Sequence, residues 1–244
     1  MRRAGRVAYG VGAAGMGVLI LLSGKLASVF QSVPPWVPLR QWLAYISGAA
    51  LVASGLVLSA SKPTRLAALV LTVNFSVWLL LFNLPTLLAH PKVVGAWEGC
   101  GLNMTVVAGG LILLSRVNLA RRVYAVGLPL IALAHFLNAR GAIEYVPAWL
   151  PLRIDWVYLT GAGHVAAGLA ILFGVLPQLA ALLEAGQITA FVILTHLPAV
   201  YRARGDRVQW AMLFYALAIA GAAWLVVATF GNGSRTRNLR HATG

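Results

Sequence analysis

The stretch VPPWVPLRQWLAYISGAALVASGL, Val33 to Leu56, is repeated with changes as VPAWLPLRIDWVYLTGAGHVAAGL, Val146 to Leu169. Each copy has prolines around a tryptophan, then an arginine, and then an apolar run that contains glycines. The register holds without a gap from Val33–Trp97 against Val146–Trp210, and 21 of these 65 residue pairs are identical. Self-similarity on this scale predicts a duplicated architecture.

The composition predicts an integral membrane protein of the all-α class. The 244 residues are 60% hydrophobic and only 10% charged. Their apolar residues come in blocks of roughly twenty, the length of helix that crosses a bilayer core of about 30 Å. We expect eight transmembrane helices, near Val7–Ser28, Trp42–Ala60, Leu66–Leu88, Trp97–Leu114, Val123–Ala139, Asp155–Phe173, Leu179–Val200 and Gln209–Thr229.

The repeat divides these helices into two units of four. Residues 1–117 form the first unit, residues 118–230 the second, and residues 231–244 a polar tail. Because four is even, both units enter and leave the membrane on one side. They are therefore predicted to be parallel pseudo-repeated four-helix bundles, related by an axis along the membrane normal.

The distribution of basic residues predicts the orientation. In a soluble protein the net charge of +14 would suggest a nucleic-acid partner, but in a membrane protein cationic loops set topology and meet anionic lipids, so no nucleic acid is expected. The arginine-rich composition is typical of a GC-rich bacterial genome, and we expect a multi-pass protein of the plasma (inner) membrane. Both termini should be cytoplasmic, since their face carries eleven basic residues and no acidic one: Arg2, Arg3, Arg6, Lys62, Arg65, Arg116, Arg121, Arg122, Arg235, Arg237 and Arg240.

The quoted stretches are interpreted as elbows between the first and second helix of each unit. Proline lacks an N–H and keeps the preceding residue extended, so it ends one helix and shapes the next turn. Tryptophan prefers the headgroup level of a bilayer. Glycines in the helices that follow (Gly48, Gly55, Gly161 and Gly168) should let neighbouring helices approach closely. The structural elbow residues are Pro34, Trp36, Pro38, Arg40, Pro147, Trp149 and Pro151.

The pattern P-x-W-x-P, followed by a helix with tyrosine and spaced glycines, resembles the DoxX family. His135–Phe136 before the second elbow and LAAL near the start of each third helix fit the same resemblance. The resemblance covers essentially the whole chain, as two tandem units where family members commonly have one. It implies a small membrane subunit of a redox complex, facing quinone and working with soluble redox subunits. An acidic residue that often follows the family's second-helix glycine is absent here, where Leu51 and His164 stand.

Ionisable residues inside a bilayer are costly and are therefore functional candidates. The candidate ligand-binding residues are His135, Arg153, Tyr158, His164 and His196, and Glu184 is a candidate for a proton relay. The register pairs His164 with Leu51, Glu184 with Leu71 and His196 with Asn83, so the second unit is predicted to carry the site. Several polar groups fall near the outer end of the spans, where they are predicted to hold a quinone or lipid headgroup.

Depth weighs against a direct relay from His164 to Glu184. Counting ~1.5 Å per residue places His164 near the midplane and Glu184 on the cytoplasmic side. Asp155 is expected to form an interfacial ion pair with Arg153, of little value if exposed. A motif-based metal or haem site is not predicted, because the three histidines lie on different helices without ligand spacing.

Three function classes remain open from the sequence. The first is the quinone-interacting or accessory redox subunit, the second a small-molecule or lipid transporter or binding protein, and the third a scaffold or assembly factor without catalysis. No nucleophile paired with a base and no phosphate-binding motif appears, so whether the chain is an enzyme stays open. The single cysteine, Cys100, excludes an intramolecular disulfide and a CxxC redox centre. Substrate, protein partner and oligomeric state are not determined by the sequence.

Overall fold

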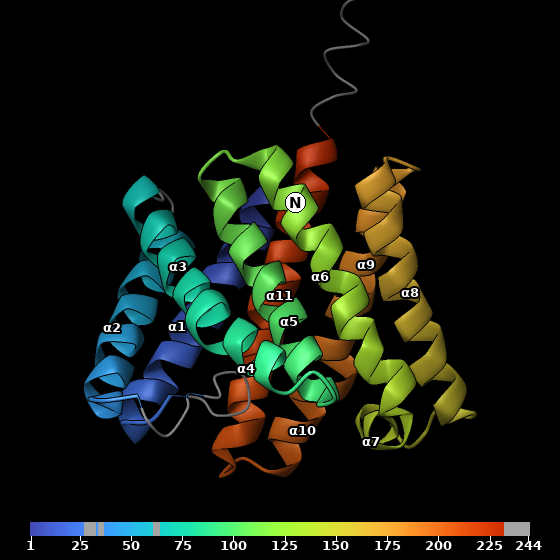
Figure 1. Ribbon diagram of the computed structural model, residues 1–244, viewed down its shortest axis with the longest axis horizontal. Coiled ribbons are helices and arrows are strands. Elements are labelled where there is room, and N and C mark those ends of the chain that lie inside the picture. The colour runs from blue at the N-terminus through green and yellow to red at the C-terminus, as the bar shows by residue number, and fades with distance from the viewer. Residues whose placement is uncertain (27–32, 34–36, 61–63, 232–244) are drawn as a thin grey trace, which may run out of the picture.

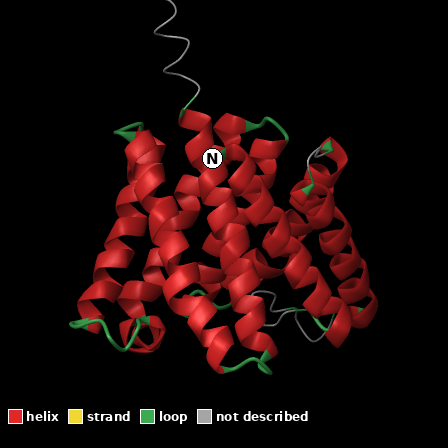
Figure 2. Cartoon of the chain, turned by 180° about the vertical axis from the view of Figure 1, so that it is seen from behind, coloured by secondary structure: helices red, strands yellow, loops and turns green. Residues whose placement is uncertain are grey.

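A computed structural model describes residues 1–26, 33, 37–60 and 64–231, and throughout this part the regular structure is helical, with no strand (Figures 1 and 2). Eight helical stretches are long and apolar enough to cross a membrane, as the sequence predicts. The elements are α1 (Arg2–Ser23), α2 (Arg40–Ser59), α3 (Arg65–Trp78), η1 (Leu79–Asn83), α4 (Leu84–Ala89), α5 (Val94–Leu113), α6 (Val117–Leu137), α7 (Ala139–Ala142), η2 (Ile143–Tyr145), α8 (Arg153–Phe173), α9 (Pro177–Phe191), η3 (Val192–His196), α10 (Leu197–Arg202) and α11 (Arg207–Phe230).

Two spans begin earlier than the apolar pattern predicts. The first starts at Arg2 rather than Val7, and the fifth at Val117 rather than Val123. Arginine is a good helix former and its long side chain can reach water from within a helix end. The predicted spans were bounded by runs of apolar residues, so they left out these turns with arginines. The backbone is helical through both turns. Residues 117–122, which lie between the predicted fourth and fifth spans, therefore belong to helix α6.

The third and seventh spans contain matched π-helical turns. Residues Leu79–Asn83 and Val192–His196 are π-helical, and each is followed by a leucine and then Pro85 or Pro198. A proline ring clashes with the carbonyl four residues before it and offers no N–H to that carbonyl. Widening the preceding turn relieves this conflict, and such π-bulges are frequent inside helices. Each span continues beyond the proline as α4 or α10.

The two elbows also share local geometry. Leu39 and Leu152 both adopt the left-handed conformation, with φ of 53° and 52°, immediately before α2 and α8. The Arg40 guanidinium donates to the Val33 carbonyl at 2.8 Å, and Arg153 donates to the carbonyl of Val146 at 2.8 Å. Each arginine thus holds the chain that enters its elbow. Pro34 and Trp36 lie outside the described residues, while Trp149 is 71% exposed.

The helices α1, α5, α6 and α11 form the centre of the molecule, and α2 with α3 and α8 with α9 flank it on opposite sides (Figure 1). α1 packs along α2 and α11, whereas α5 packs along α6. Within the first predicted unit, α1 also reaches α5, where the Tyr9 hydroxyl donates to the Val106 carbonyl at 2.8 Å. α11 is the most buried span, and the fully buried rings of Tyr9, Tyr124 and Tyr215 fill the core around it.

Close helix contacts depend on glycine, as the sequence predicts. A Cβ on Gly168 would lie 2.7 Å from the Ala125 carbonyl oxygen, and one on Gly161 would lie 2.7 Å from the His135 Cβ. Both distances are too short for non-bonded atoms, so glycine is required for α8 to approach α6 this closely. The same contact positions the histidine of α6 against α8.

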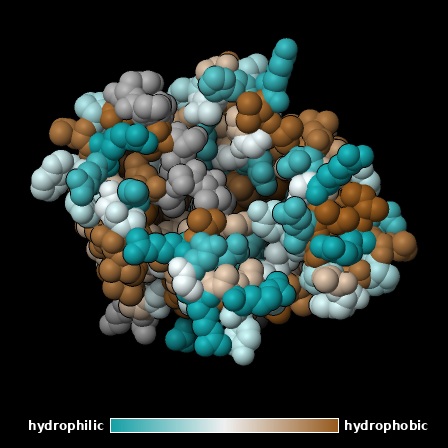
Figure 3. Space-filling view, turned by 90° about the horizontal axis from the view of Figure 1, so that it is seen from below, coloured by the Kyte–Doolittle hydropathy of each residue, from teal (hydrophilic) through white to brown (hydrophobic). Residues whose placement is uncertain are grey.

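The outer surface of the spans is apolar. Leu56, Leu159 and Leu183 are each at least 60% exposed, and they lie on three different spans. Large exposed apolar surfaces are rare on soluble monomers but suit contact with lipid chains. The end of the molecule that carries α4, α7 and α10 presents polar side chains among apolar ones (Figure 3). The chain is accordingly a multi-pass membrane protein.

Candidate functional site

The centre of the candidate site is a buried contact between two ionisable side chains. His164 on α8 and Glu184 on α9 are each 2% exposed, and Nδ1 of the histidine lies 2.8 Å from Oε1 of the glutamate. Moving either group out of water is costly unless it is hydrogen-bonded, and each provides the other's partner. Among the described residues this is the one contact between an acidic and a basic side chain within 4.0 Å.

Gln187 fixes the orientation of the imidazole. Its Nε2 donates to the Thr160 carbonyl at 3.0 Å and lies 3.2 Å from Nε2 and 3.3 Å from Nδ1 of His164. The amide therefore packs beside both ring nitrogens of the imidazole. Nδ1 is the ring nitrogen that faces Glu184, at 2.8 Å from Oε1.

Aromatic rings enclose the pair on one side. The His135 ring centroid lies 5.1 Å from that of His164 in an edge-on arrangement, and His135 stacks on Phe191 with centroids 6.4 Å apart. Phe191 also lies 6.1 Å from His164. The site therefore joins helices α6, α8 and α9, and it places two imidazoles next to each other in the membrane interior.

Two buried polar atoms beside this cluster have no hydrogen-bond partner among the described residues. They are Oε2 of Glu184 and the hydroxyl of Tyr124 on α6, and the two groups interact electrostatically. An unsatisfied buried polar atom costs about 1–3 kcal/mol. Native proteins normally satisfy such atoms with ordered water or a ligand. The two atoms therefore mark the polar side of the site.

A second carboxylate approaches from α5. Glu98 is half-buried near the start of that helix and interacts electrostatically with both His164 and Tyr145. Tyr145 lies in η2, outside the spans, and burial together with Glu98 and Glu144 raises its pKa. Titratable groups thus run from the end of the molecule that holds η2 toward the buried pair.

The expectation that depth keeps His164 and Glu184 apart is wrong, because Nδ1 and Oε1 lie 2.8 Å from each other. Glu184 lies seven residues after Pro177, where α9 begins, and His164 lies nine residues before Phe173, where α8 ends. These counts correspond to roughly 10 Å and 14 Å along two neighbouring helices. The remaining difference of about 4 Å is within the reach of the two side chains.

The other candidate ligand residues lie elsewhere. Arg153 donates to the carbonyls of Ile143 and Val146, so the predicted ion pair with Asp155 does not form. Tyr158 stacks on Phe136 and is 45% exposed. His196 ends the π-helical turn η3 and is half-buried. In the described part of the chain none of the three makes a hydrogen bond or ring contact with His135, His164 or Glu184.

The first half of the chain has the matching polar contact between its second and third helices, but it lacks the ionisable pair. Asn74 bonds to Ser47 across α3 and α2 at 3.2 Å, at the positions that match Gln187 and Thr160. The positions that match His164 and Glu184 are Leu51 and Leu71, and both leucines are 0% exposed. The polar bridge between the second and third helix is therefore present twice, whereas the His–Glu pair is present once.

Sequence reasoning singled out His135, His164 and Glu184 but missed two other members of the cluster. Tyr124 reads as an ordinary apolar core residue, and Glu98 reads as a loop carboxylate because it follows Trp97 at a span boundary. No group of three His, Cys, Asp or Glu side chains suited to a metal ion occurs within residues 1–26, 33, 37–60 and 64–231.

Comparisons with protein-family models, curated proteins and solved structures find no match for this chain. The resemblance to the DoxX family accordingly stays a prediction.

Proposed function

We propose that this chain is a quinone-interacting membrane subunit of a redox complex, and that the cluster around His164 and Glu184 binds the headgroup of the quinone. The observation that carries the proposal is the buried His164–Glu184 contact beside two polar atoms without a partner. The proposal also takes the resemblance to the DoxX family as its support. The enzyme activity, if any, would belong to the complex rather than to this chain alone.

The chemistry of a quinone suits these groups. Its carbonyl oxygens accept hydrogen bonds, and its flat ring packs against aromatic side chains such as His135 and Phe191. Reduction to the quinol takes two electrons and two protons, and the protons end on the two oxygens. His164 and Glu184 are groups that can hold and release protons inside the membrane, where such residues commonly serve as relays. The electrons would come from a soluble redox subunit.

The proposed topology follows the duplication. We place both termini in the cytoplasm of a bacterium, with the elbows on the outer side of the inner membrane, because the basic residues favour that orientation. The two units of four helices would be related by an axis along the membrane normal, with the first helix of each packed on the last helix of the other. The matched partners of α1 with α11 and α5 with α6 support this exchange.

A second candidate function is proton-coupled transport of a small molecule. Glu98 favours it, because this carboxylate interacts electrostatically with both His164 and Tyr145 and extends the set of titratable groups beyond the buried pair. Transport would require flux across a sealed vesicle, which a redox subunit does not show. Scaffolding without chemistry predicts that both buried ionisable residues can be replaced without loss of function.

The test is a mild-detergent purification of the full chain, followed by mass spectrometry of the extracted quinones and of co-purifying proteins. We expect quinone enriched above its share in the bulk lipid extract, together with a soluble redox protein. The His164→Leu/Glu184→Leu double variant should lose the quinone and retain the protein partner. Bulk lipid alone in the wild-type preparation would contradict the proposal, and proton-driven uptake into vesicles would favour transport.

A further inference from the structure

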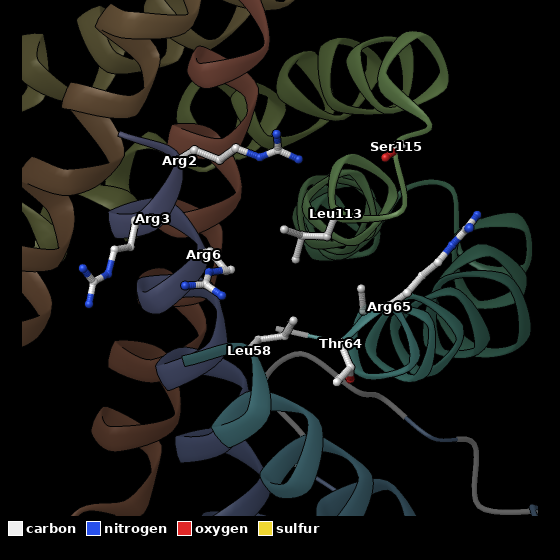
Figure 4. A pocket seen from close by; sticks show the side chains of 9 residues that line it. Arg2, Arg3, Arg6, Leu58, Thr64, Arg65, Leu113 and Ser115 are labelled. Carbon is white, nitrogen blue, oxygen red and sulfur yellow. The ribbon is translucent and has the colours of Figure 1, made fainter. Parts of the chain in front are cut away.

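A second site lies at the opposite end of the molecule from the elbows, where α1 and α3 begin and α5 ends. A cavity of about 730 Å³ opens there, and its lining includes four arginines, two hydroxyl side chains and three apolar residues. In Figure 4 Arg2 extends from α1 toward Leu113 and Ser115, whereas Arg6 stays close to α1 on the side toward Leu58. The side chains of Arg3 and Arg65 point away from the cavity and form its rim.

Arg6 is the unusual member of this group. Its side chain is only 8% exposed, yet Nη1 has no hydrogen-bond partner among the described residues. A guanidinium keeps its charge at every physiological pH, so it cannot avoid burial costs by losing a proton. A buried charge of this kind is expected to have an ionic or hydrogen-bonded partner.

The described part of the chain supplies no such partner. The sequence contains five acidic residues, and none of them lines the cavity. Arg2 and Arg6 instead both line it, which leaves like charges near each other. An anion from outside the chain would reduce this repulsion and would satisfy the buried guanidinium.

We propose that this cavity binds a phosphate-bearing anion, with Arg6 and Arg2 as its principal ligands. A guanidinium presents paired N–H groups that match two phosphate oxygens. The hydroxyl of Ser115 adds a donor, and the start of α3 at Arg65 adds the positive end of a helix dipole. Leu58, Ala68 and Leu113 give the cavity an apolar wall, which favours the headgroup of an acidic phospholipid over a free phosphate.

This site is independent of the proposed quinone site. It is lined by residues at the ends of α1, α2, α3 and α5, and it shares no ionisable residue with the cluster around His164 and Glu184. The variants that test it are Arg6→Gln and Arg2→Gln. Arg6→Gln removes a buried unpaired charge and should not weaken folding, and Arg2 is exposed. Arg122→Gln is the matched control, since Arg122 is an exposed arginine on α6 that does not line the cavity.

The experiment has two arms on the purified full chain. In the first, native mass spectrometry counts dioleoylphosphatidylglycerol retained after delipidation, with dioleoylphosphatidylcholine as the comparison lipid. In the second, equilibrium dialysis measures binding of radiolabelled inorganic phosphate. We expect Arg6→Gln and Arg2→Gln each to weaken binding by roughly tenfold or more, while Arg122→Gln binds like the wild type.

Each outcome decides the proposal. Selective retention of phosphatidylglycerol that depends on Arg6 identifies a lipid headgroup as the ligand. Binding of inorganic phosphate that depends on Arg6 identifies a soluble anion. Absence of binding in both arms, or equal losses in Arg6→Gln and Arg122→Gln, would overturn it, since general surface charge would then explain any attraction.

Discussion

The buried contact between His164 and Glu184 predicts an unusual pattern of stability in a double-mutant cycle. His164→Leu leaves a buried carboxylate without its partner, and Glu184→Leu leaves a buried imidazole without its own. Breaking a buried ion pair costs about 3–5 kcal/mol, whereas replacing both members by apolar residues is often neutral. The double variant should therefore be nearly as stable as the wild type. Leu51 and Leu71 already occupy the matching positions of the first half, fully buried.

The size of the coupling energy identifies the charge state of the pair. A neutral hydrogen bond between membrane helices is worth about 0.6 kcal/mol on average and at most about 1.7 kcal/mol. We predict a coupling energy of about 3 kcal/mol or more, because the N···O distance is 2.8 Å and both side chains are excluded from water.

Unfolding of the four proteins in mixed micelles of increasing SDS fraction, followed by circular dichroism, measures the cycle. Ser47→Ala provides a control, because it removes a polar contact from the corresponding frame of the first half without touching a charged group. A double variant whose loss of stability equals the sum of the two single losses would refute the reasoning. It would mean that the two side chains do not depend on each other.

Three further predictions concern the frame around the site. Gly161→Val should destabilise the protein by about 1–3 kcal/mol, because the new side chain would meet His135 on α6. Gly186→Ala should not destabilise it, since nothing lies within 4 Å of the added Cβ; thermal unfolding measures both variants. Arg153→Gln should lower stability by about 1 kcal/mol or more, because Arg153 donates to two elbow carbonyls; an unchanged thermal unfolding midpoint would contradict this. The raised pKa of Tyr145 should keep its phenol protonated above pH 10, so its contribution to stability is constant below that pH and is lost as pH rises further; absorbance titration against Tyr145→Phe measures this.

The spans and the elbows were accessible from the sequence because they follow from local rules. Blocks of apolar residues predict membrane helices, and prolines beside a tryptophan predict turns at the interface. The internal repeat aligns Leu39 with Leu152 and Arg40 with Arg153, and the structure gives each pair the same local geometry. The π-helical turns before Pro85 were not predicted, although the steric conflict of that proline explains them afterwards.

Helix neighbours and the full composition of the site were less accessible. A repeat in the sequence tells which residues correspond but not which helices pack together, so the contact of α1 with α11 had no signal. The contact between His164 and Glu184 was missed because residue counts give depth along a helix without its rotation or tilt. Tyr124 stands between Val123 and Ala125, and nothing in the sequence distinguishes it from the other buried tyrosines.

The central claim, that the second half holds a quinone site at the His164–Glu184 pair, is tested most directly by equilibrium binding. The measurement uses a short-chain quinone and the full protein in lipid nanodiscs, as wild type, as His164→Leu/Glu184→Leu and as His196→Leu. Because His196 lies outside the cluster, its variant should bind like the wild type, while the double variant should bind at least about tenfold more weakly. Equal affinity in all three proteins would contradict the account.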